Sequence, residues 1–289
     1  SSSDVAKTYD GDTSASGTAV VTSGTLYNNA SNGGLLDNIS GGTFAYTDAN
    51  AGSGNKTVTV SGVTLDDGNS GSNYTVSYAN NTTSTINPYA VDLTGTRTYD
   101  GTITVASSVL SIGSLVGTET LTLSGSGSIV DKHVGVNKAV TLGSLALGDG
   151  TGLASNYTFT GGSQAVAITQ ADLSITTSDV IKSYDGSLAS IGAAIVDSAS
   201  GTQLFTSDTL SGGTFAYTDA NAGSGNKAVT VSGVTLNDGN SGLNYNISYV
   251  NNTSSTINQA ALTISSSDVA KTYDGDTSAS GTAVVTSGT

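Results

Sequence analysis

The sequence predicts an all-β protein of tandem modules, each a small β-sandwich-like fold, that together form an elongated rod. Three observations support this prediction: long internal repeats, short segments in which apolar and polar residues alternate, and clusters of Gly, Asn, Asp and Ser that separate these segments. Alternation with a period of two is typical of strands, and turn clusters about every 8–12 residues are typical of sandwiches and barrels.

The repeats define the organisation of the chain. The segment Ser1–Thr25 recurs without a change at Ser265–Thr289, and the tripeptide Tyr-Asp-Gly begins at Tyr9, Tyr99, Tyr184 and Tyr273. We therefore predict three full modules and the start of a fourth, over residues 1–88, 89–172, 173–262 and 263–289. An unchanged copy beside a diverged neighbour indicates duplication of three-module blocks, so we expect the chain to be a window from a longer array.

The first and third modules are near copies, because Ile39–Ile86 and Leu210–Ile257 differ at only 8 of 48 positions. The middle module has diverged but keeps the order of its motifs. Each module has an Asp-to-Lys turn segment, then Leu-x-Asp-Gly, then Asn-Tyr. The Asn-Tyr pairs begin at Asn73, Asn156 and Asn244.

The strands are expected where Val, Thr, Tyr and Phe alternate with polar residues, as in Thr43–Tyr46, Thr57–Val60 and Tyr74–Tyr78. The best helix candidate, Ser187–Val196, contains a Gly and ends in β-branched residues, so we expect a short helical turn there at most. A helix packed on a sheet would make the module β-grasp-like instead, and this alternative stays open.

The joints between modules contain no flexible Gly/Ser linker. Each carries an Ile and, a few residues on, a Leu: Ile86 and Leu93, Ile168 and Leu173, Ile257 and Leu262. The last strand of one module is therefore expected to run almost directly into the first strand of the next, which favours a stiff rod.

The recurring polar residues have a structural explanation. In the Tyr-Asp-Gly turn, Asp bonds to a backbone N–H two residues on, Gly supplies a positive φ, and the Tyr ring covers the module end with its hydroxyl paired. A basic residue two positions before each Tyr, and a second set at Lys56, Lys138 and Lys227, are expected to form local ion pairs rather than to bind acidic glycans. The predicted structural motif comprises Lys7, Tyr9, Asp10, Gly11, Arg97, Tyr99, Asp100, Gly101, Lys182, Tyr184, Asp185, Gly186, Lys271, Tyr273, Asp274 and Gly275.

The acidic loops raise the hypothesis of a calcium site, because calcium binds oxygen ligands. Asp67, Asp149 and Asp238 recur in all three modules, but the loops around them lack the full pattern of alternating acids and the terminal Glu of an EF-hand. Turn chemistry is the favoured interpretation, with calcium as a weak alternative, and no other cofactor or metal is expected.

Composition disfavours most other function classes. The chain has no Cys and one His, so thiolate chemistry is excluded and His133 has no second His for a zinc site. A formal charge of −14 argues against nucleic acid as a partner. No segment is apolar enough for a membrane-spanning helix. No catalytic residues can be singled out, and an enzyme is the least expected class.

With these motifs in hand, the modules resemble the YDG-type domains that occur in tandem in large bacterial surface proteins, including filamentous-haemagglutinin-like adhesins exported by two-partner secretion. The resemblance rests on Lys-Thr-Tyr-Asp-Gly at Lys7–Gly11, on the segment that leads to Lys-x-Val-Thr, and on Asn-Tyr with the Ile-to-Leu module end. It implies a secreted or cell-surface fibre of a Gram-negative bacterium, and it implies no catalytic or ligand-binding residue.

The leading hypothesis for function is a stalk: a structural repeat region of a long extracellular filament or adhesin, acting in cell adhesion or in a biofilm matrix. In one alternative the chain self-assembles as a sheath or matrix fibre through strand edges or strand donation, with other copies of the array as partners and the fourth module, 263–289, as an open end. In the other, the modules bind glycans or a host protein through Tyr74, Tyr78, Asn80 and Asn81.

Overall fold

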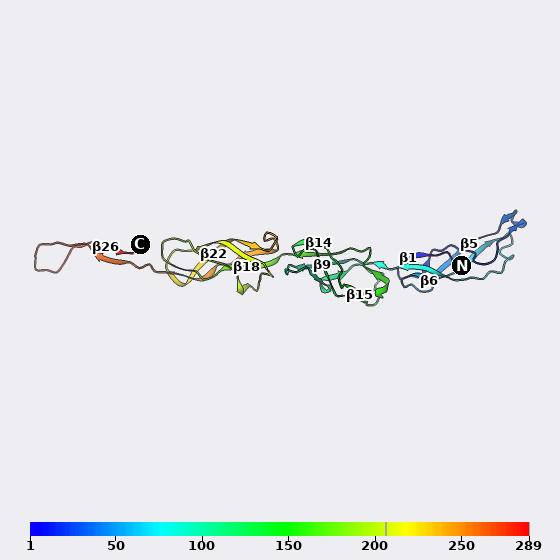
Figure 1. Ribbon diagram of the computed structural model, residues 1–289, viewed down its shortest axis with the longest axis horizontal. Helices are drawn as coiled ribbons and strands as arrows, with labels where there is room; N and C mark the ends of the chain where they lie inside the picture. The colour runs from blue at the N-terminus through cyan, green and yellow to red at the C-terminus, as the bar shows by residue number, and fades with distance from the viewer. Residues whose placement is uncertain (206, 289) are drawn as a thin grey trace. The chain divides into compact units, whose positions relative to one another are not determined.

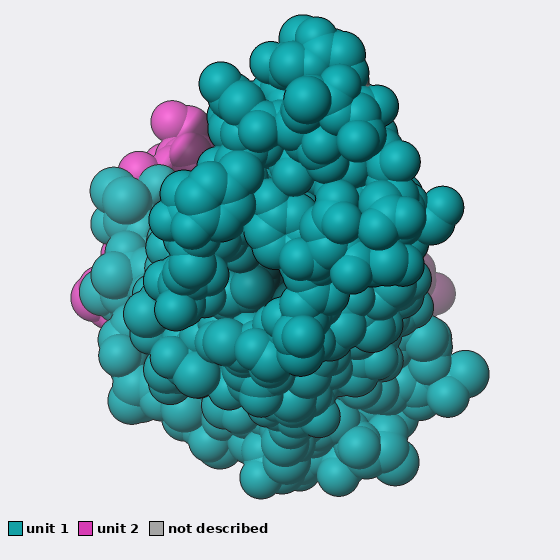
Figure 2. All heavy atoms as spheres, turned by 90° about the vertical axis from the view of Figure 1, so that its right-hand side faces the viewer, with its two compact units in different colours: residues 1–97, 103–131, 135–167 teal, residues 98–102, 132–134, 168–289 magenta. Residues whose placement is uncertain are grey.

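The computed structural model describes residues 1–205 and 207–288, so Thr289, the last residue of the predicted fourth module, lies outside the described residues. The chain divides into two compact units: residues 1–97, 103–131 and 135–167 form unit 1, and residues 98–102, 132–134 and 168–289 form unit 2. Figure 2 colours these units and shows a hollow in the face of unit 1 that it presents. The division falls inside the predicted second module, so the compact units do not coincide with the sequence repeats.

The all-β prediction is confirmed. The described part of the chain consists of strands, loops and four three-residue 3₁₀ segments, without an α-helix (Figure 1). The β-grasp-like alternative, which needs a helix on the sheet, is therefore wrong. No helix in residues 1–205 or 207–288 has the length and apolar character that crossing a bilayer would require.

The first module contains one five-stranded sheet in the order β1-β7-β6-β5-β2. Strands β1 and β7 are parallel, and the other pairs are antiparallel. A hairpin of two short strands, β3 and β4, flanks the sheet. The elements are β1 (Ala6–Thr8), β2 (Ser14–Ala15), β3 (Asn28–Asn29), η1 (Ala30–Asn32), β4 (Leu35–Leu36), β5 (Asn38–Tyr46), β6 (Gly52–Asp66) and β7 (Asn81–Asn87).

This sheet curls into a half-barrel. Its two edge strands, β1 and β2, are joined by a short segment that contains a turn at Gly11, where φ is 78°. A flat sheet of five strands would be about 19 Å wide, and a segment this short that also reverses direction at Gly11 does not reach across it. The backbone N–H of Ser3 also donates to the carbonyl of Thr18, so the two edges meet on the other side of β1 and β2 as well.

The second module keeps a four-stranded sheet in the order β11-β9-β17-β14 and three small two-stranded pairs. Its elements are β8 (Tyr89–Ala90), β9 (Leu93–Thr98), β10 (Thr104–Ala106), η2 (Ser107–Val109), β11 (Leu110–Ile112), β12 (Leu121–Ser124), β13 (Ser126–Ser128), β14 (Gly135–Ala139), β15 (Ala146–Asp149), η3 (Ala154–Asn156), β16 (Tyr157–Thr158) and β17 (Gln164–Thr169).

The third module has two sheets, β19-β24-β22-β21 and β20-β18-β23. The first repeats the sheet of the first module, whereas the second contains β18, the strand that follows β17 almost without a break. The elements are β18 (Ala171–Thr177), β19 (Ile181–Ser183), β20 (Ala194–Val196), η4 (Ser198–Ser200), β21 (Thr209–Tyr217), β22 (Gly223–Asn237), β23 (Tyr245–Tyr249) and β24 (Asn252–Asn258); an exposed hairpin of β25 (Thr263–Ser266) and β26 (Ala283–Ser287) follows.

Ser187–Val196, where we expect a short helical turn at most, forms none: Ala189 pairs with Ala216 of β21, and the segment ends in the strand β20. One local prediction is wrong. Tyr74–Tyr78 is not a strand, although its near copy in the third module is β23. Strand β23 pairs with β18, whereas no strand of residues 1–205 and 207–288 pairs with Tyr74–Tyr78.

The core of unit 1 is continuous across the boundary between the first two modules. One cluster of buried side chains contains Tyr9, Tyr46 and Ile86 from the first module together with Val91 and Tyr157 from the second. Because a core of this kind is close-packed, the two modules do not bury their apolar side chains independently.

Candidate functional site

The Tyr-Asp-Gly turns share one geometry. The Asp side chain accepts a hydrogen bond from the backbone N–H two residues on: Asp10 from Asp12 at 3.0 Å, Asp100 from Thr102 at 2.9 Å and Asp185 from Ser187 at 2.9 Å. The Gly that follows has a φ of 72–78° in all four copies. A residue with a Cβ rarely adopts this conformation, so the turn needs Gly.

The lysine before each turn anchors it. Lys7 Nζ donates to Asp10 Oδ1 at 2.8 Å and to the carbonyl of Asp12 at 2.6 Å, and it lies 5.5 Å from the centre of the Tyr46 ring. Lys182 repeats the ion pair with Asp185 at 2.8 Å, and this pair with the Ser187 N–H bond lowers the pKa of Asp185 to about 2. Lys271 pairs with Asp274 at 2.9 Å, and Arg97 takes the equivalent place in the second module.

The second set of lysines also forms local pairs. Lys138 Nζ lies 2.7 Å from Asp131 Oδ1, Lys227 pairs with Asp219 at 2.6 Å, and Lys56 pairs with Asp48. The acidic partner in each case stands at the start of the same turn. These contacts use the lysines inside the module, so they present no periodic charge for a ligand.

The tyrosine of the first Tyr-Asp-Gly turn reaches into the second module. The Tyr9 hydroxyl donates to Glu119 Oε1, and the hydroxyl of Tyr157 donates to Glu119 Oε2, both at 2.5 Å. The two rings meet edge to face with centroids 5.6 Å apart. One carboxylate therefore joins the turn of one module to the Asn-Tyr segment of the next, entirely within unit 1.

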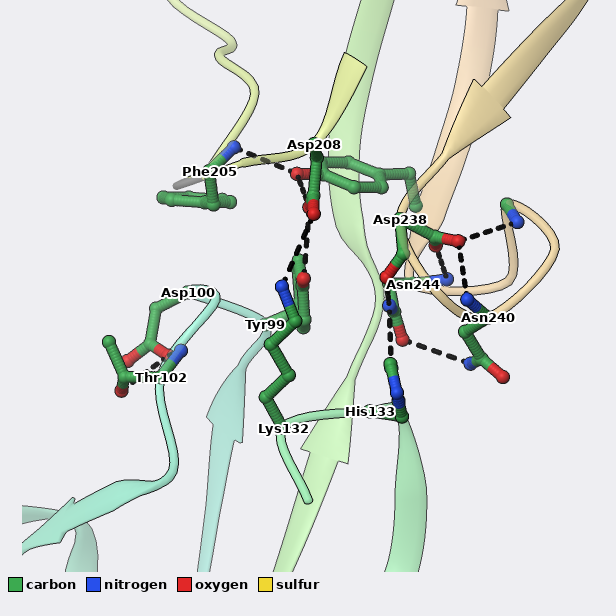
Figure 3. Close-up of polar contacts among 12 residues, drawn as sticks. Tyr99, Asp100, Thr102, Lys132, His133, Phe205, Asp208, Asp238, Asn240 and Asn244 are labelled. Atoms are coloured by element: carbon green, nitrogen blue, oxygen red, sulfur yellow. Dashed lines mark hydrogen bonds and ion pairs between the residues drawn. The ribbon is translucent and has the colours of Figure 1, made fainter. Parts of the chain in front are cut away.

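The same arrangement recurs within unit 2 (Figure 3). The hydroxyls of Tyr99 and Tyr245 both donate to Asp208 Oδ2, at 2.9 and 2.8 Å, and the rings are 5.3 Å apart. Lys132 Nζ lies 3.2 Å from Asp208 Oδ1 and 5.6 Å from the centre of the Tyr99 ring. Asp208 is buried and Lys132 offsets the cost of burying its charge, whereas Glu119 is half-buried and forms no ion pair with a Lys or Arg among the described residues.

Burial is the main cause that raises the pKa of the tyrosine hydroxyls at both places, and the adjacent carboxylate adds to it. It raises the pKa of Tyr157 to about 12 and shifts those of Tyr9, Tyr99 and Tyr245 in the same direction. The hydroxyls consequently stay protonated at neutral pH and remain hydrogen-bond donors.

Each of these turn tyrosines meets the Asn-Tyr segment of the following repeat, as expected for domains arranged in tandem. The comparison with known families agrees with this arrangement. A family model described as the YDG domain matches the chain three times in tandem, over residues 1–85, 82–166 and 169–254. The chain belongs to the YDG domain family. Comparison with curated proteins and with solved structures found no match.

The first YDG domain contains the same acidic position without its second tyrosine. The Tyr74 hydroxyl donates to Asp37 Oδ2 at 2.8 Å, as Tyr157 and Tyr245 do to their carboxylates. Asp37 is only 3% exposed, and its Oδ1 is buried without a hydrogen-bond partner.

Sequence reasoning missed the acidic residue of these sites. Asp37, Glu119 and Asp208 each stand immediately before a strand-forming segment in the three YDG domains, so the aligned repeats carried the signal. An acid that only accepts hydrogen bonds from tyrosines fits neither the spacing of metal ligands nor that of a catalytic pair. The change from Asp to Glu in the second domain hid the position further.

The Asn of each Asn-Tyr pair makes a second contact between successive YDG domains. Asn156 Oδ1 accepts from the backbone N–H of Ala51 at 2.8 Å, and Asn244 Oδ1 accepts from that of Val134 at 3.0 Å. Asn244 Nδ2 lies 3.0 Å from His133 Nδ1 (Figure 3), so His133 is part of this contact.

The weak calcium candidates hold their loops through backbone bonds. Asp67 Oδ1 accepts from the N–H of Asn69 and Gly71, and Oδ2 accepts from that of Asn73; Asp238 repeats all three bonds. Burial works to raise the pKa of Asp67, but these bonds outweigh it and lower the pKa. Asp149 accepts from the N–H of Ala154 at 2.7 Å. Across the described residues, no three His, Cys, Asp or Glu side chains gather as metal ligands would.

The residues of the predicted glycan-binding cluster also have partners inside the first YDG domain. The Tyr74 hydroxyl is bound to Asp37, and the Tyr78 hydroxyl accepts from the Val63 N–H at 3.1 Å. Asn81 Nδ2 donates to Asp4 Oδ1 at 2.9 Å, while Asn80 is exposed. These contacts favour a structural role for the cluster.

Proposed function

We propose that this chain of tandem YDG domains is the stalk region of a long extracellular bacterial filament or adhesin, in a Gram-negative cell envelope, with a role in adhesion or in a biofilm matrix. In this proposal the domains hold a tip away from the cell and bind no substrate. Their task is to keep one arrangement relative to each other over a long array.

One observation carries the proposal: successive domains are joined by a hydrogen bond from a tyrosine to a buried or half-buried carboxylate. Tyr9 of the first domain donates to Glu119 of the second, and Tyr99 of the second donates to Asp208 of the third. Coupling of this kind is expected where repeats must act as one body, because the stability of a repeat array combines that of each repeat with that of its neighbour contacts. A row of independent binding modules would not require it. The absence of a flexible linker between β17 and β18 agrees with the same role.

Distance measurements between spin labels test the coupling. Because the chain contains no Cys, single cysteines can be labelled at the exposed strand positions Thr64, Ser111 and Thr235, one in each domain. Double electron–electron resonance on the Thr64–Ser111 and Ser111–Thr235 pairs should give narrow distance distributions. Broad distributions in the unmodified chain would contradict the stalk.

Two variants act as controls for one another. Tyr9→Phe removes the donor to Glu119 and should broaden only the Thr64–Ser111 distance. Tyr99→Phe removes the donor to Asp208 and should broaden only the Ser111–Thr235 distance. Equal broadening of both distances by either variant would show that general instability, and not the junction, had been measured.

The extracellular location needs its own experiment. Antibodies against the chain should label intact cells that produce the protein, without permeabilisation, and protease added outside the cells should remove the label. Labelling only after permeabilisation would contradict a surface stalk, whatever the distance measurements show.

A further inference from the structure

The junction between the second and third YDG domains contains the one histidine of the chain. His133 belongs to the second domain, and its ring Nδ1 lies 3.0 Å from the side-chain Nδ2 of Asn244 in the third domain (Figure 3). The ring also packs against a loop of the third domain, because a Cβ added at Gly239 would lie 3.4 Å from its Cε1. His133 therefore contacts the next domain directly.

The orientation of the Asn244 amide is fixed by its other partners. Its Oδ1 accepts from the backbone N–H of Val134 at 3.0 Å and from Nδ2 of Asn240 at 3.0 Å. A backbone N–H can only donate, so the atom that faces Val134 has to be the oxygen. Asn244 is 0% exposed, and a flipped amide would bury two N–H groups against each other. Its Nδ2 therefore stays on the side of His133 and acts as a donor.

The ring nitrogen that faces Asn244 must accept this hydrogen bond. A neutral imidazole has one nitrogen without a proton, and the contact assigns that nitrogen as Nδ1 of His133. The imidazolium form carries a proton on both nitrogens and has no acceptor left. Protonation would therefore turn the hydrogen bond into two N–H groups that face each other, so the contact requires the neutral ring.

The junction between the first and second domains has the same contact without a titratable group. Asn156 Oδ1 accepts from the backbone N–H of Ala51 at 2.8 Å, and Asn156 Nδ2 donates to Oδ1 of Asn50 at 3.0 Å. In the aligned repeats Asn50 stands at the place of His133. An amide oxygen accepts without titrating, so acid leaves this hydrogen bond intact.

The charged groups near His133 leave its requirement in place. Burial works to raise the pKa of Asp238, on the loop that the ring packs against, but three backbone N–H groups bind its carboxylate and lower the pKa. The other charged groups of the junction form two ion pairs, Asp131 with Lys138 and Lys132 with Asp208. Tyr99 and Tyr245 stay uncharged because burial raises their pKa. Histidine is the side chain that ordinarily changes its charge between about pH 5 and about pH 8.

We infer that His133 makes the junction between the second and third YDG domains sensitive to pH: the Asn244 contact is closed with the neutral ring and opens when the ring is protonated. Acid favours the open form because that form takes up the proton without losing a hydrogen bond. The contacts of Asp208 remain, so the junction loosens without coming apart. This pH response goes beyond the proposed stalk, and the junction that contains Asn50 does not share it.

Amide exchange at two places in one sample tests the inference. The Val134 N–H donates to Asn244, and the Ala51 N–H donates to Asn156. From about pH 8 to about pH 5, exchange at Val134, corrected for the intrinsic rate, should accelerate about tenfold relative to Ala51, as expected for the loss of one hydrogen bond. The side-chain amide resonances of Asn244 should shift with the same midpoint as the His133 ring. A constant ratio of the two exchange rates overturns the inference.

The substitution His133→Asn is the matched control, because it places the residue of the first junction at the second. The amide oxygen of the new side chain can accept from Asn244 at either pH. The corrected exchange rate at Val134 should then be the same at about pH 5 and about pH 8. Acceleration as large as in the parent chain would mean that another group senses the pH, and the inference would be wrong.

Spin-label distances show whether the contact controls the two domains. In the parent chain, the Ser111–Thr235 distribution should be narrow at about pH 8 and broader at about pH 5, while the Thr64–Ser111 distribution stays narrow at both. His133→Asn should keep both distributions narrow. A Ser111–Thr235 distribution that is equally narrow at both pH values overturns this inference and leaves the stalk standing.

Discussion

The first and third YDG domains are nearly identical over Ile39–Ile86 and Leu210–Ile257, yet one segment within this stretch differs in structure. Tyr245–Tyr249 forms β23 in the third domain, whereas Tyr74–Tyr78 forms no strand in the first. The substitutions at positions 75, 76 and 79 do not explain this, since Thr, Val and Ala are compatible with a strand. The difference is the neighbour: β18 pairs with β23, whereas none of the described strands pairs with Tyr74–Tyr78.

Two features made entirely within one domain are the same in both. The Tyr46 hydroxyl donates to the carbonyls of Val5 and Thr85, and the Tyr217 hydroxyl makes the same two bonds in the third domain. The long hairpins β5–β6 and β21–β22 have equivalent registers. A YDG domain thus has a part that its own sequence determines and a part that depends on the strand entering from its neighbour.

The largest expected effect comes from removing that strand's buried side chain. Leu173→Ala leaves a cavity at a fully buried position and should lower the free energy of unfolding by about 2–5 kcal/mol. Leu262→Ala, at the equivalent but exposed position, should change it by less than about 0.5 kcal/mol in dilute solution. Chemical denaturation of both variants checks this. Equal losses of unfolding free energy in the two variants would contradict this prediction, because they would mean that Leu173 and Leu262 have the same surroundings.

The tyrosines at occupied junctions predict an alkaline loss of stability. The pKa of Tyr157 is raised to about 12, so the folded state holds its proton more tightly than the unfolded chain does. Its contribution is complete below about pH 10 and disappears as the pH rises toward 12, a loss of about 2–3 kcal/mol at most.

Denaturation curves from about pH 9 to about pH 12, with tyrosinate absorbance followed in parallel, measure this alkaline loss. Tyr157→Phe should be less stable at neutral pH and should lose less on alkaline titration. If Tyr157→Phe lost as much unfolding free energy on alkaline titration as the parent chain does, Tyr157 would not be the group that causes the loss. Tyr184→Phe, at a partly exposed position, is the control that should behave as the parent does.

The smallest expected loss of stability comes from removing the lysine before the turn, and it should be the same in the first and third domains. Lys7→Ala and Lys182→Ala each remove a local ion pair and a cation–π contact, at a cost of about 1 kcal/mol or less. Hydrogen exchange of the Asp12 and Ser187 amides, which bond to Asp10 and Asp185, should accelerate to the same extent. An effect confined to one domain would show that the turn also depends on the neighbouring domain.

Much of the fold follows from local sequence. Alternation placed Thr43–Tyr46 and Thr57–Val60 inside β5 and β6, and the joint at Ile168 and Leu173 is the passage from β17 into β18. These elements form because their own residues suit a strand. Tyr74–Tyr78 has the same pattern, but a strand also needs a partner, and single-sequence patterns do not say which segments will supply one.

The candidate site was predictable only in part. Motif spacing identified the turn residues Tyr9 and Tyr99, and the Asn-Tyr pairs, but not the carboxylates between them. The Tyr9 and Glu119 side chains meet although they stand far apart in sequence and in different repeats. No local pattern contains that contact, whereas an alignment of the three repeats shows an acid at Asp37, Glu119 and Asp208.

Parallel pairing with the last strand determines how a YDG domain responds to tension. Strand β1 runs parallel to β7, and β19, the second strand of the third domain, runs parallel to β24, so a strand near the start of each of these domains lies beside its last strand. Pulling on the two ends slides these strands past each other and loads the hydrogen bonds between them together, in shear, instead of opening them one after another. A domain joined to its neighbours through these strands should therefore yield abruptly and at high load, which suits a tether that is pulled along its length.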